Sequence, residues 1–436
     1  MQIYEITNKK SIMNESFGVE LTQQIELPYG SRKITFQLPA SWNLLGQFMP
    51  HDPKVSKSPH DLLSNALNNL LGMANFSSLI QDKKNIIIIS DDKSRPTPTH
   101  ILIPLLLNKL NAAGIPDANI KIVVGRGLHP SLTRDELRDK FGAEVLNRVK
   151  VHDHNPTGNL TYIGETSFGT QVFVNSEVYA ADFKIGLGSI LPHELAGFTG
   201  GSGIVIPGVA SQDTINQNHC LVGSFEAEFG KLEGNTIRDD MEEAAKLLGL
   251  DLIINTILNS ENQILEIVAG DPIIAHHHGV TISKEIYGVK IPKLANVVIA
   301  SSYPRDATFG KATKALFSSH LAIKNDGIII LLAPCKEGIS SSQIFHDMLL
   351  QNPTSDTLFD YIRKGQLPGE SCVLYLFAKV KESRIIVVSD GLNPDQVAQM
   401  GLEFAPDLET ALSRITLTNP DVLILPKGAI TLPLLQ

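Results

Sequence analysis

Hydrophobic and polar residues alternate near the beginning of the chain. Residues 17–40 show this period-two pattern around the turn-forming sequence Pro28-Tyr29-Gly30-Ser31. Strict alternation is typical of strands with one buried face. We therefore expect a β-hairpin here, with Ile34, Phe36 and Leu38 on the same face.

Beyond the hairpin, helical spacing alternates with short apolar runs. Residues 85–90 read NIIIIS, an almost wholly apolar run that is typical of a strand buried on both faces. Such alternation predicts a parallel, doubly wound sheet. The expected helices are 58–73, 99–113 and 133–141, and the expected strands are 85–90, 120–124 and 148–152.

A second alternation begins with the apolar run NVVIA at 296–300. Two alternations predict two α/β domains with largely parallel sheets and an active-site cleft between them. The expected elements between and within them are short strands over 159–190, a helix at 238–249, a connector over 270–292, helices at 307–321 and 340–350, and strands at 327–333 and 384–389. The expected domains are 1–285, possibly joined by 420–436, and 286–419, and a final strand at 422–425 fits either.

The composition is that of a packed globular protein, with 43% hydrophobic and 19% charged residues. The net charge of −9 leaves no basic excess to meet phosphates, which argues against a nucleic-acid or anionic-membrane partner. No apolar stretch is long enough to span a bilayer, and the polar N-terminal segment lacks the apolar core of a signal peptide. The three cysteines, Cys220, Cys335 and Cys372, are far apart, so we expect a cytoplasmic protein without a disulfide framework.

Charged residues directly follow the isoleucine strand, in the sequence SDDKSRPTPT at 90–99. Ligands of doubly wound sheets bind beyond the carboxyl ends of strands, where Asp92 and Arg95 are expected. Arg95 offers a planar fork that suits a carboxylate. The same residues are equally compatible with an ordinary helix start, with Asp92 as a cap and Pro96 in the first turn.

Two further segments place a histidine beside glycines. The sequence VGRGLHP at 124–130 puts His129 after the next strand, although a lone loop histidine is usually an ordinary surface residue. The sequence LPHELAGFTGGSGIVIPG at 191–208 follows His193 with several glycines, which permit close approach of the backbone to a bound group. Apolar residues such as Phe198 argue against a flexible surface loop.

The remaining candidates are weaker when each is taken alone. His219 could bind nickel or zinc as a neutral imidazole, but a packed histidine is commoner. The tract 276–278 reads HHH and looks like a metal tract, yet neighbouring helical positions face different ways and no second cluster is near in sequence. Lys311 and Lys314 share one face of an expected helix, where a solvated surface is the ordinary explanation.

Known enzyme signatures are otherwise missing from the sequence: it contains no P-loop lysine motif, no GxSxG and no HExxH. Taken in order, however, a colinear series of segments resembles the nickel-dependent lactate racemase family over nearly the whole chain. The series is more specific than any one motif. It consists of SDDKSRPTP, GRGLHP, LPHELAGFTGG, IPG, NHCLVG, GNTIRDDMEEAA, AGDPIIAHH, SSYPRDATFGKATKA and LLAPCKEG.

The resemblance implies a nickel-pincer nucleotide as cofactor, a pyridinium ring with sulfur arms and a nickel–carbon bond. By the same resemblance, His219 would bind nickel, and His129 and His193 would be the two catalytic histidines. Arg95 and Lys314 would hold a small 2-hydroxy acid. The positions implied near the cofactor are Asp92, Thr199, Gly200, Gly201, Ser202, Gly203 and Lys311.

The sequence departs from the family pattern at one decisive position. The family usually has a lysine ten residues after the histidine of the 191–208 segment, and that lysine joins the cofactor covalently. Here the residue is Gly203, and Lys184 is no substitute because it precedes His193. Gly310 also stands where the family has a tyrosine on the cofactor side.

The sequence therefore leads to the hypothesis of a 2-hydroxy-acid racemase or epimerase with a non-covalently bound cofactor. One alternative is another hydride-transfer enzyme acting on a larger hydroxy or sugar acid, because Gly203 and Gly310 would leave extra room. Another is a non-catalytic protein that binds the nickel nucleotide. The presence of both His129 and His193 argues against the latter, since storage needs no proton-transfer groups.

Overall fold

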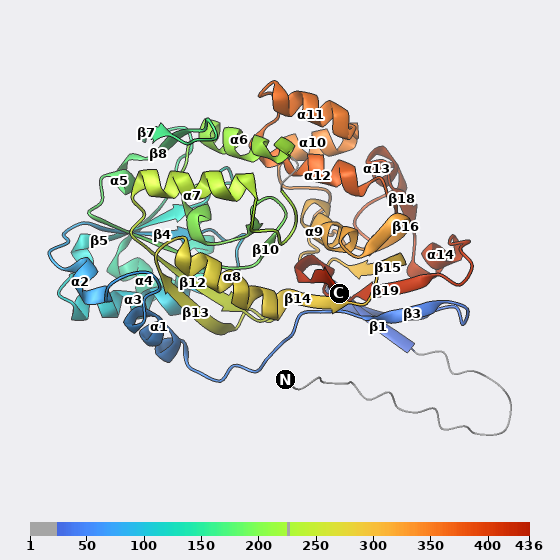
Figure 1. Cartoon of the computed structure of the whole chain (residues 1–436), viewed down its shortest axis with the longest axis horizontal. Helices are drawn as coiled ribbons and strands as arrows, with labels where there is room; N and C mark the ends of the chain where they lie inside the picture. Colours follow the sequence, from blue (N-terminus) through green and yellow to red (C-terminus); the bar gives the residue numbers. More distant parts are fainter. Residues whose placement is uncertain (1–23, 225–226) are drawn as a thin grey trace.

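The computed structural model describes residues 24–224 and 227–436, which form two α/β lobes side by side (Figure 1). Each lobe contains a six-stranded sheet covered on both faces. The predicted α/β fold with largely parallel sheets is confirmed. Among the described residues, no helix has the length and apolar character that crossing a membrane requires.

The sheet of the first lobe is parallel except at one edge, where β12 and β13 are antiparallel. The isoleucine strand lies in its middle and is buried on both faces, as predicted: Ile86 and Ile88 contact one core, and Ile87 and Ile89 contact the other. In order, the strands are β13 (Ile264–Gly270), β12 (Leu252–Leu258), β9 (Phe183–Ser189), β4 (Ile86–Asp91), β5 (Ile120–Gly125) and β6 (Lys150–Asp153).

Helices cover the two faces of this sheet in two groups. One face is packed by α1 (Pro59–Asn68), α3 (Thr99–Ala112) and α4 (Arg134–Arg148). The other is packed by α7 (Thr236–Leu248), α8 (Ile274–Tyr287) and a glycine-rich loop at 197–203. Shorter elements complete the lobe: α2 (Phe76–Ile80), β7 (Leu160–Glu165), β8 (Gln171–Asn175), α5 (Ser176–Tyr179), β10 (Pro192–His193), β11 (Gly197–Phe198) and α6 (Gln212–Cys220).

The sheet of the second lobe is wholly parallel. Its strands are β18 (Glu403–Ala405), β17 (Arg384–Val388), β16 (Ile323–Leu332), β15 (Ala295–Ser301), β19 (Asp421–Leu425) and β3 (Asn43–Gln47). Its helices are α9 (Phe309–His320), α10 (Gln343–Gln351), α11 (Ser355–Arg363), α12 (Val373–Val380), α13 (Pro394–Gln399) and α14 (Leu408–Ser413). A small sheet of β14 (Gly288–Ile291) and β20 (Leu432–Leu435) lies where the lobes join.

The beginning of the described chain lies with the second lobe. The predicted hairpin forms from β1 (Gln24–Tyr29) and β2 (Arg32–Gln37), and residues 17–23 of the expected hairpin lie outside the described residues. Its apolar face packs on Val297 and Ile330, and β3 pairs with β19 (Figure 1). Residues 24–47 therefore differ from the expected assignment to the first domain. Local pattern shows that a strand forms, but not which distant sheet it joins.

The expected connector over 270–292 is wrong, because most of it is helix α8. Asp271 begins this helix by accepting hydrogen bonds from the backbone amides of Ile273 and Ile274. Gly270, Pro272 and Pro292 flank this segment and suggested a connector, although its buried positions have helical spacing. Strands β12 and β13 were not anticipated, and the expected helix at 133–141 extends to Arg148 across a kink at Gly142.

Candidate active site

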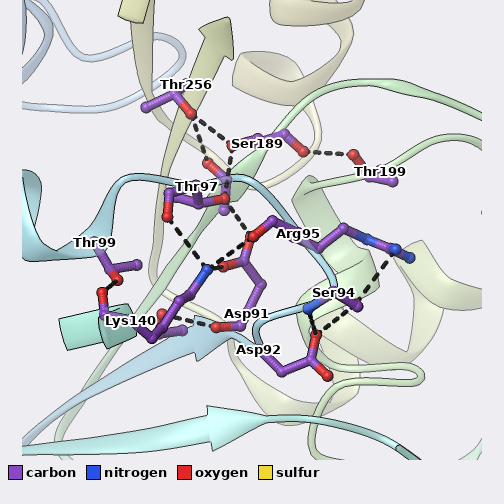
Figure 2. A network of polar contacts seen from close by, with 12 residues as sticks. Asp91, Asp92, Ser94, Arg95, Thr97, Thr99, Lys140, Ser189, Thr199 and Thr256 are labelled. Carbon is purple, nitrogen blue, oxygen red and sulfur yellow. Dashed lines mark hydrogen bonds and ion pairs between the residues drawn. The ribbon is translucent and has the colours of Figure 1, made fainter. Parts of the chain in front are cut away.

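A buried ion pair shapes the loop that follows β4. Lys140 donates from Nζ to Asp91 Oδ1 at 2.8 Å, and also to the carbonyl oxygens of Arg95 (3.1 Å) and Thr97 (3.2 Å). Figure 2 shows these groups pointing at one another, while the Arg95 side chain extends away from them. Thr97 links the loop to β9 through Ser189, whose Oγ lies 2.6 Å from Thr97 Oγ1. The loop is thereby held in one conformation that presents Arg95.

Asp92 directly follows Asp91 at the end of β4. Its carboxylate orients His129, which follows the neighbouring strand β5. The Nδ1 of His129 lies 2.7 Å from Asp92 Oδ2, and the hydroxyl and amide of Ser94 donate to Asp92 Oδ1. The His129 and Ser94 hydrogen bonds and the nearby Arg95 charge outweigh burial and hold the pKa of Asp92 far below its ordinary value. The ionised carboxylate therefore places the His129 proton on Nδ1 and leaves Nε2 as a free acceptor.

His193 meets Arg95 at the start of the glycine-rich loop. Arg95 Nη2 lies 3.4 Å from His193 Nε2, although the two residues are 98 positions apart. His193 Nδ1 accepts from the backbone amides of Leu195 (3.2 Å) and Ala196 (3.3 Å). The neutral ring therefore carries its proton on Nε2. Burial lowers the pKa of His193 well below its ordinary value, so the neutral form dominates.

Lys314 of α9 reaches this group from the other lobe. Its ammonium forms an ion pair with Glu194, whose Oε2 also lies 3.9 Å from His193 Nε2. Burial and the charges of Arg95 and Arg305 lower the pKa of Lys314, while Glu194 opposes that shift. The neighbouring His193 and Lys314 hold the pKa of Glu194 far below its ordinary value, despite burial. Both lobes thus contribute charged groups to one site.

His219 lies near the end of α6 and has the features of a metal ligand. Its Nδ1 lies 3.0 Å from Asn218 Oδ1, which leaves Nε2 as the free acceptor. Asn218 is itself fixed by donating to Asp240 Oδ2 at 2.7 Å. Burial lowers the pKa of His219 to about 4, so the ring is neutral at neutral pH. A neutral imidazole oriented by a second polar group suits nickel or zinc.

The loop at 197–203 is held by the buried Arg238, which donates to the carbonyl oxygens of Ala196, Phe198 and Gly200. Gly201 has a φ of 56°, and a Cβ there would lie 2.6 Å from the ring of His276. At Gly203, by contrast, a Cβ would have no atom within 4 Å. Space for a side chain therefore exists at position 203 of the loop.

The predicted residues divide into those that contact one another and those that do not. Arg95, His193 and Lys314 form one group through Glu194, and His129 joins it by way of Asp92. His219 lies close enough to this group that a proton on its ring would lower the pKa of His193. Thr199 holds the loop by donating to the carbonyl of Ser189, whereas Ser202 Oγ is buried without a partner among the described residues.

Among the described residues, Lys311 and Gly310 form no hydrogen bond or ion pair with the side chains of Arg95, His193 and Lys314. Lys311 is exposed, and its backbone amide completes the start of α9 by donating to Thr308. A Cβ at Gly310 would lie 3.1 Å from the Phe345 ring, so the extra room expected there is filled. Lys184 donates to the carbonyl of Ala181 and is a structural residue of β9.

Sequence reasoning missed Glu194 and Arg305. Glu194 adjoins His193, and its odd placement in an apolar stretch was a usable signal. Arg305 follows a strand end in SSYPRD, the kind of position that drew attention to Arg95. Burial and the charge of Arg95 lower the pKa of Arg305. Arg95, Arg305 and Lys314 therefore lie close enough to influence one another electrostatically, and Lys314 pairs with Glu194.

Two family models match the chain along most of its length. The lactate racemase N-terminal domain matches residues 29–230, and the lactate racemase C-terminal domain matches residues 291–431. A lactate racemase of Thermoanaerobacterium thermosaccharolyticum is 32% identical over 399 residues, covering 89% of this chain and 93% of that protein. A lactate racemase of Lactiplantibacillus plantarum is 32% identical over 403 residues, covering 89% and 94%.

Solved structures agree with this match. The lactate racemase apoprotein of T. thermosaccharolyticum superposes with a TM-score of 0.83 at 29% identity, covering 94% of this chain and all of the other. A protein of Thermotoga maritima has a TM-score of 0.66 at 18% identity, covering 89% of this chain and all of the other, which extends the likeness of fold.

Proposed function

Because this chain belongs to the lactate racemase family, we propose that it interconverts the enantiomers of a small 2-hydroxy acid, using a non-covalently bound nickel-pincer nucleotide. The observation that carries the proposal is the contact between Arg95 and His193. Two hydrogen-bond donors, Arg95 Nη2 and His193 Nε2–H, lie 3.4 Å apart and need an acceptor between them. A carboxylate or hydroxyl oxygen of a substrate meets that need.

The charge balance favours an anionic substrate. Arg95, Arg305 and Lys314 influence one another electrostatically. Glu194 pairs with Lys314, and the ionised Asp92 lies near Arg95, so these two carboxylates leave one of the three positive charges in excess. An incoming carboxylate would relieve the repulsion among the cations, and Arg95 would bind it through two parallel hydrogen bonds.

The two histidines would carry the proton transfers. Racemisation requires the O–H proton to leave as the C–H hydrogen departs with its electron pair, which gives a planar keto acid. His129 Nε2, free to accept because Nδ1 faces Asp92, would take that proton. The carboxylate bound beside His193 would raise the proton affinity of its ring and so favour a protonated form. When the hydrogen returns to the opposite face, this protonated His193 would give a proton to the oxygen from Nε2 and become neutral. The proton taken by His129 would then pass to solvent, and His193 would regain one from solvent, so that both rings return to their starting states.

The residues present fit the cofactor that the family implies. His219 offers a neutral, oriented imidazole to nickel, Gly203 leaves space on the loop, and Ser202 Oγ is a buried polar atom without a partner among the described residues. When bound, the nickel-pincer nucleotide would supply the electrophilic centre that takes up a hydride and returns it. Arg95 and Lys314 would meanwhile hold the keto acid so that it does not escape.

The test is a racemisation assay on protein co-produced with cofactor-making enzymes. Each pure enantiomer of lactate, and then of larger 2-hydroxy acids, would be converted to the mixture and followed by chiral chromatography. The proposal expects activity with at least one acid and a strong loss in both His129→Ala and His193→Ala. Loaded protein that binds nickel but converts no hydroxy acid would instead indicate a binding protein.

The mode of cofactor attachment has its own test. Intact mass spectrometry under denaturing conditions should give the unmodified polypeptide mass, because no lysine stands at Gly203. Native conditions should retain nickel and nucleotide, and dialysis should remove activity that added cofactor restores. A covalent nucleotide adduct in active protein would contradict non-covalent binding.

A further inference from the structure

Helices α7 and α8 bring together a group of side chains of the types that bind metals, and this group is separate from His219. Glu242 lies on α7, and His276 and His277 are neighbours on α8. One potential ligand atom from each of the three residues lies within 4.8 Å of the other two. The histidine tract lacked a nearby partner in the sequence, and the fold supplies one 35 positions away, where Glu242 Oε1 lies 2.9 Å from His277 Nε2.

His276 carries the observation that points to a ligand. The side chain is completely buried, and its Nε2 lies 2.9 Å from the carbonyl oxygen of Thr199. A carbonyl only accepts, so Nε2 carries the ring proton and Nδ1 has the lone pair. That Nδ1 is buried without a hydrogen-bond partner among the described residues. A buried acceptor without a partner destabilises the fold, and metal coordination would remove this cost.

The surroundings match those of a metal-binding histidine. Such histidines usually donate their second ring N–H to a carbonyl or carboxylate, as His276 does to Thr199. Asp239 lies close enough to influence Glu242 and His277 electrostatically. These two carboxylates against the one guanidinium of Arg238 leave a net negative charge that favours a cation.

We propose that Glu242, His276 and His277 form a second metal site that takes a zinc-like divalent cation. Two imidazoles and one carboxylate are a ligand set that Zn²⁺ uses, with water in the fourth position. The ion would join α7 to α8 and, through the Thr199 carbonyl and the ring under Gly201, would hold the glycine-rich loop. The site is independent of the proposed reaction, so either can fail without the other.

The experiment measures metal binding by the full chain after chelator treatment, with ZnCl₂ as the probe. Equilibrium dialysis with elemental analysis gives stoichiometry, and Co²⁺ gives a visible spectrum that reports coordination number. Wild type should bind one equivalent of Zn²⁺. His277→Ala and Glu242→Gln should each bind that Zn²⁺ at least tenfold more weakly than wild type does. Zinc should also raise the Tm of wild type more than that of these variants. His276 itself is left intact because it packs against Gly201.

Two controls separate this site from its neighbours. His278→Ala removes the exposed third histidine of the tract and should bind Zn²⁺ like wild type. His219→Ala removes the proposed nickel ligand and should keep the equivalent that depends on Glu242 and His277. If His277→Ala and Glu242→Gln bind Zn²⁺ as wild type does, or if wild type takes up no zinc that survives dialysis, the proposal is wrong and the three residues form only a hydrogen-bonded cluster.

Discussion

His129 Nδ1 and Asp92 Oδ2 lie 2.7 Å apart, so a buried carboxylate determines which nitrogen of His129 is free to accept a proton. Asp92→Asn should therefore lower kcat of the loaded enzyme by about 10²-fold or more, the usual contribution of a positioned general base. The amide can donate to Nδ1 and stabilise the wrong tautomer. Asp139→Asn, an exposed aspartate on α4, is the control and should leave kcat unchanged. Equal rates in both variants would remove Asp92 from the mechanism.

Arg95→Lys should weaken substrate binding while the fold stays intact. Lysine keeps the positive charge but cannot make two parallel hydrogen bonds to a carboxylate. A lost charge-assisted hydrogen bond is worth about 1.5–3 kcal/mol, which corresponds to a rise in KM of roughly 10- to 150-fold. Steady-state kinetics would measure the change, with the exposed Arg32→Lys as a matched control. Wild-type kinetics in Arg95→Lys would exclude the carboxylate-binding role.

Lys140→Met should destabilise the first lobe, because it leaves the buried Asp91 without its ion-pair partner. Breaking such a pair costs about 3–5 kcal/mol. The loop carrying Arg95 would also lose two hydrogen bonds to its carbonyl oxygens. Urea unfolding followed by circular dichroism measures the effect. Lys93→Met breaks an exposed pair with Glu136 and should cost far less stability than Lys140→Met. Similar losses in the two variants would show that the buried pair is unimportant.

Acid should destabilise the protein between pH 6.5 and 4. Burial lowers the pKa of His154 from 6.5 to about 4, so the unfolded chain binds more protons in this range and stability falls as the pH falls. His154 alone would contribute about 3 kcal/mol over the window. His154→Gln should therefore reduce the slope of unfolding free energy against pH by up to the equivalent of one proton taken up on unfolding. His100→Gln, which changes an exposed histidine, should leave the slope unchanged. Parallel plots for wild type and His154→Gln would refute this account.

Gly201 and Gly203 should respond differently to substitution. A Cβ at Gly203 meets no atom within 4 Å, so Gly203→Ala and Gly203→Lys should fold with nearly wild-type Tm. Gly201→Ala places a Cβ 2.6 Å from His276 at a φ of 56° and should cost about 1–3 kcal/mol. Thermal unfolding compares the three. A large loss of Tm in Gly203→Ala would mean that the loop leaves no space for a side chain at position 203.

The sequence alone was enough for features that depend on local pattern. Four consecutive isoleucines specify a strand that is buried on both faces, and the turn at Pro28–Ser31 specifies a hairpin. Because parallel strands end at one edge of a sheet, the sequence by itself places Arg95 and His129 at the same edge. The colinear motifs identified the family, and the family models match the chain at 29–230 and 291–431.

Tertiary structure alone decided which distant groups meet. Glu194 pairs with Lys314 across 120 positions, and Glu242 meets His277 across 35, although neither pair shares a local pattern. Strand β3 adds to a sheet whose other members follow it by more than 240 residues. Periodicity reports only whether a segment buries a face, since that depends on neighbours a few residues away. The partner that covers the face, and the charges that gather beside it, depend on packing of the whole chain.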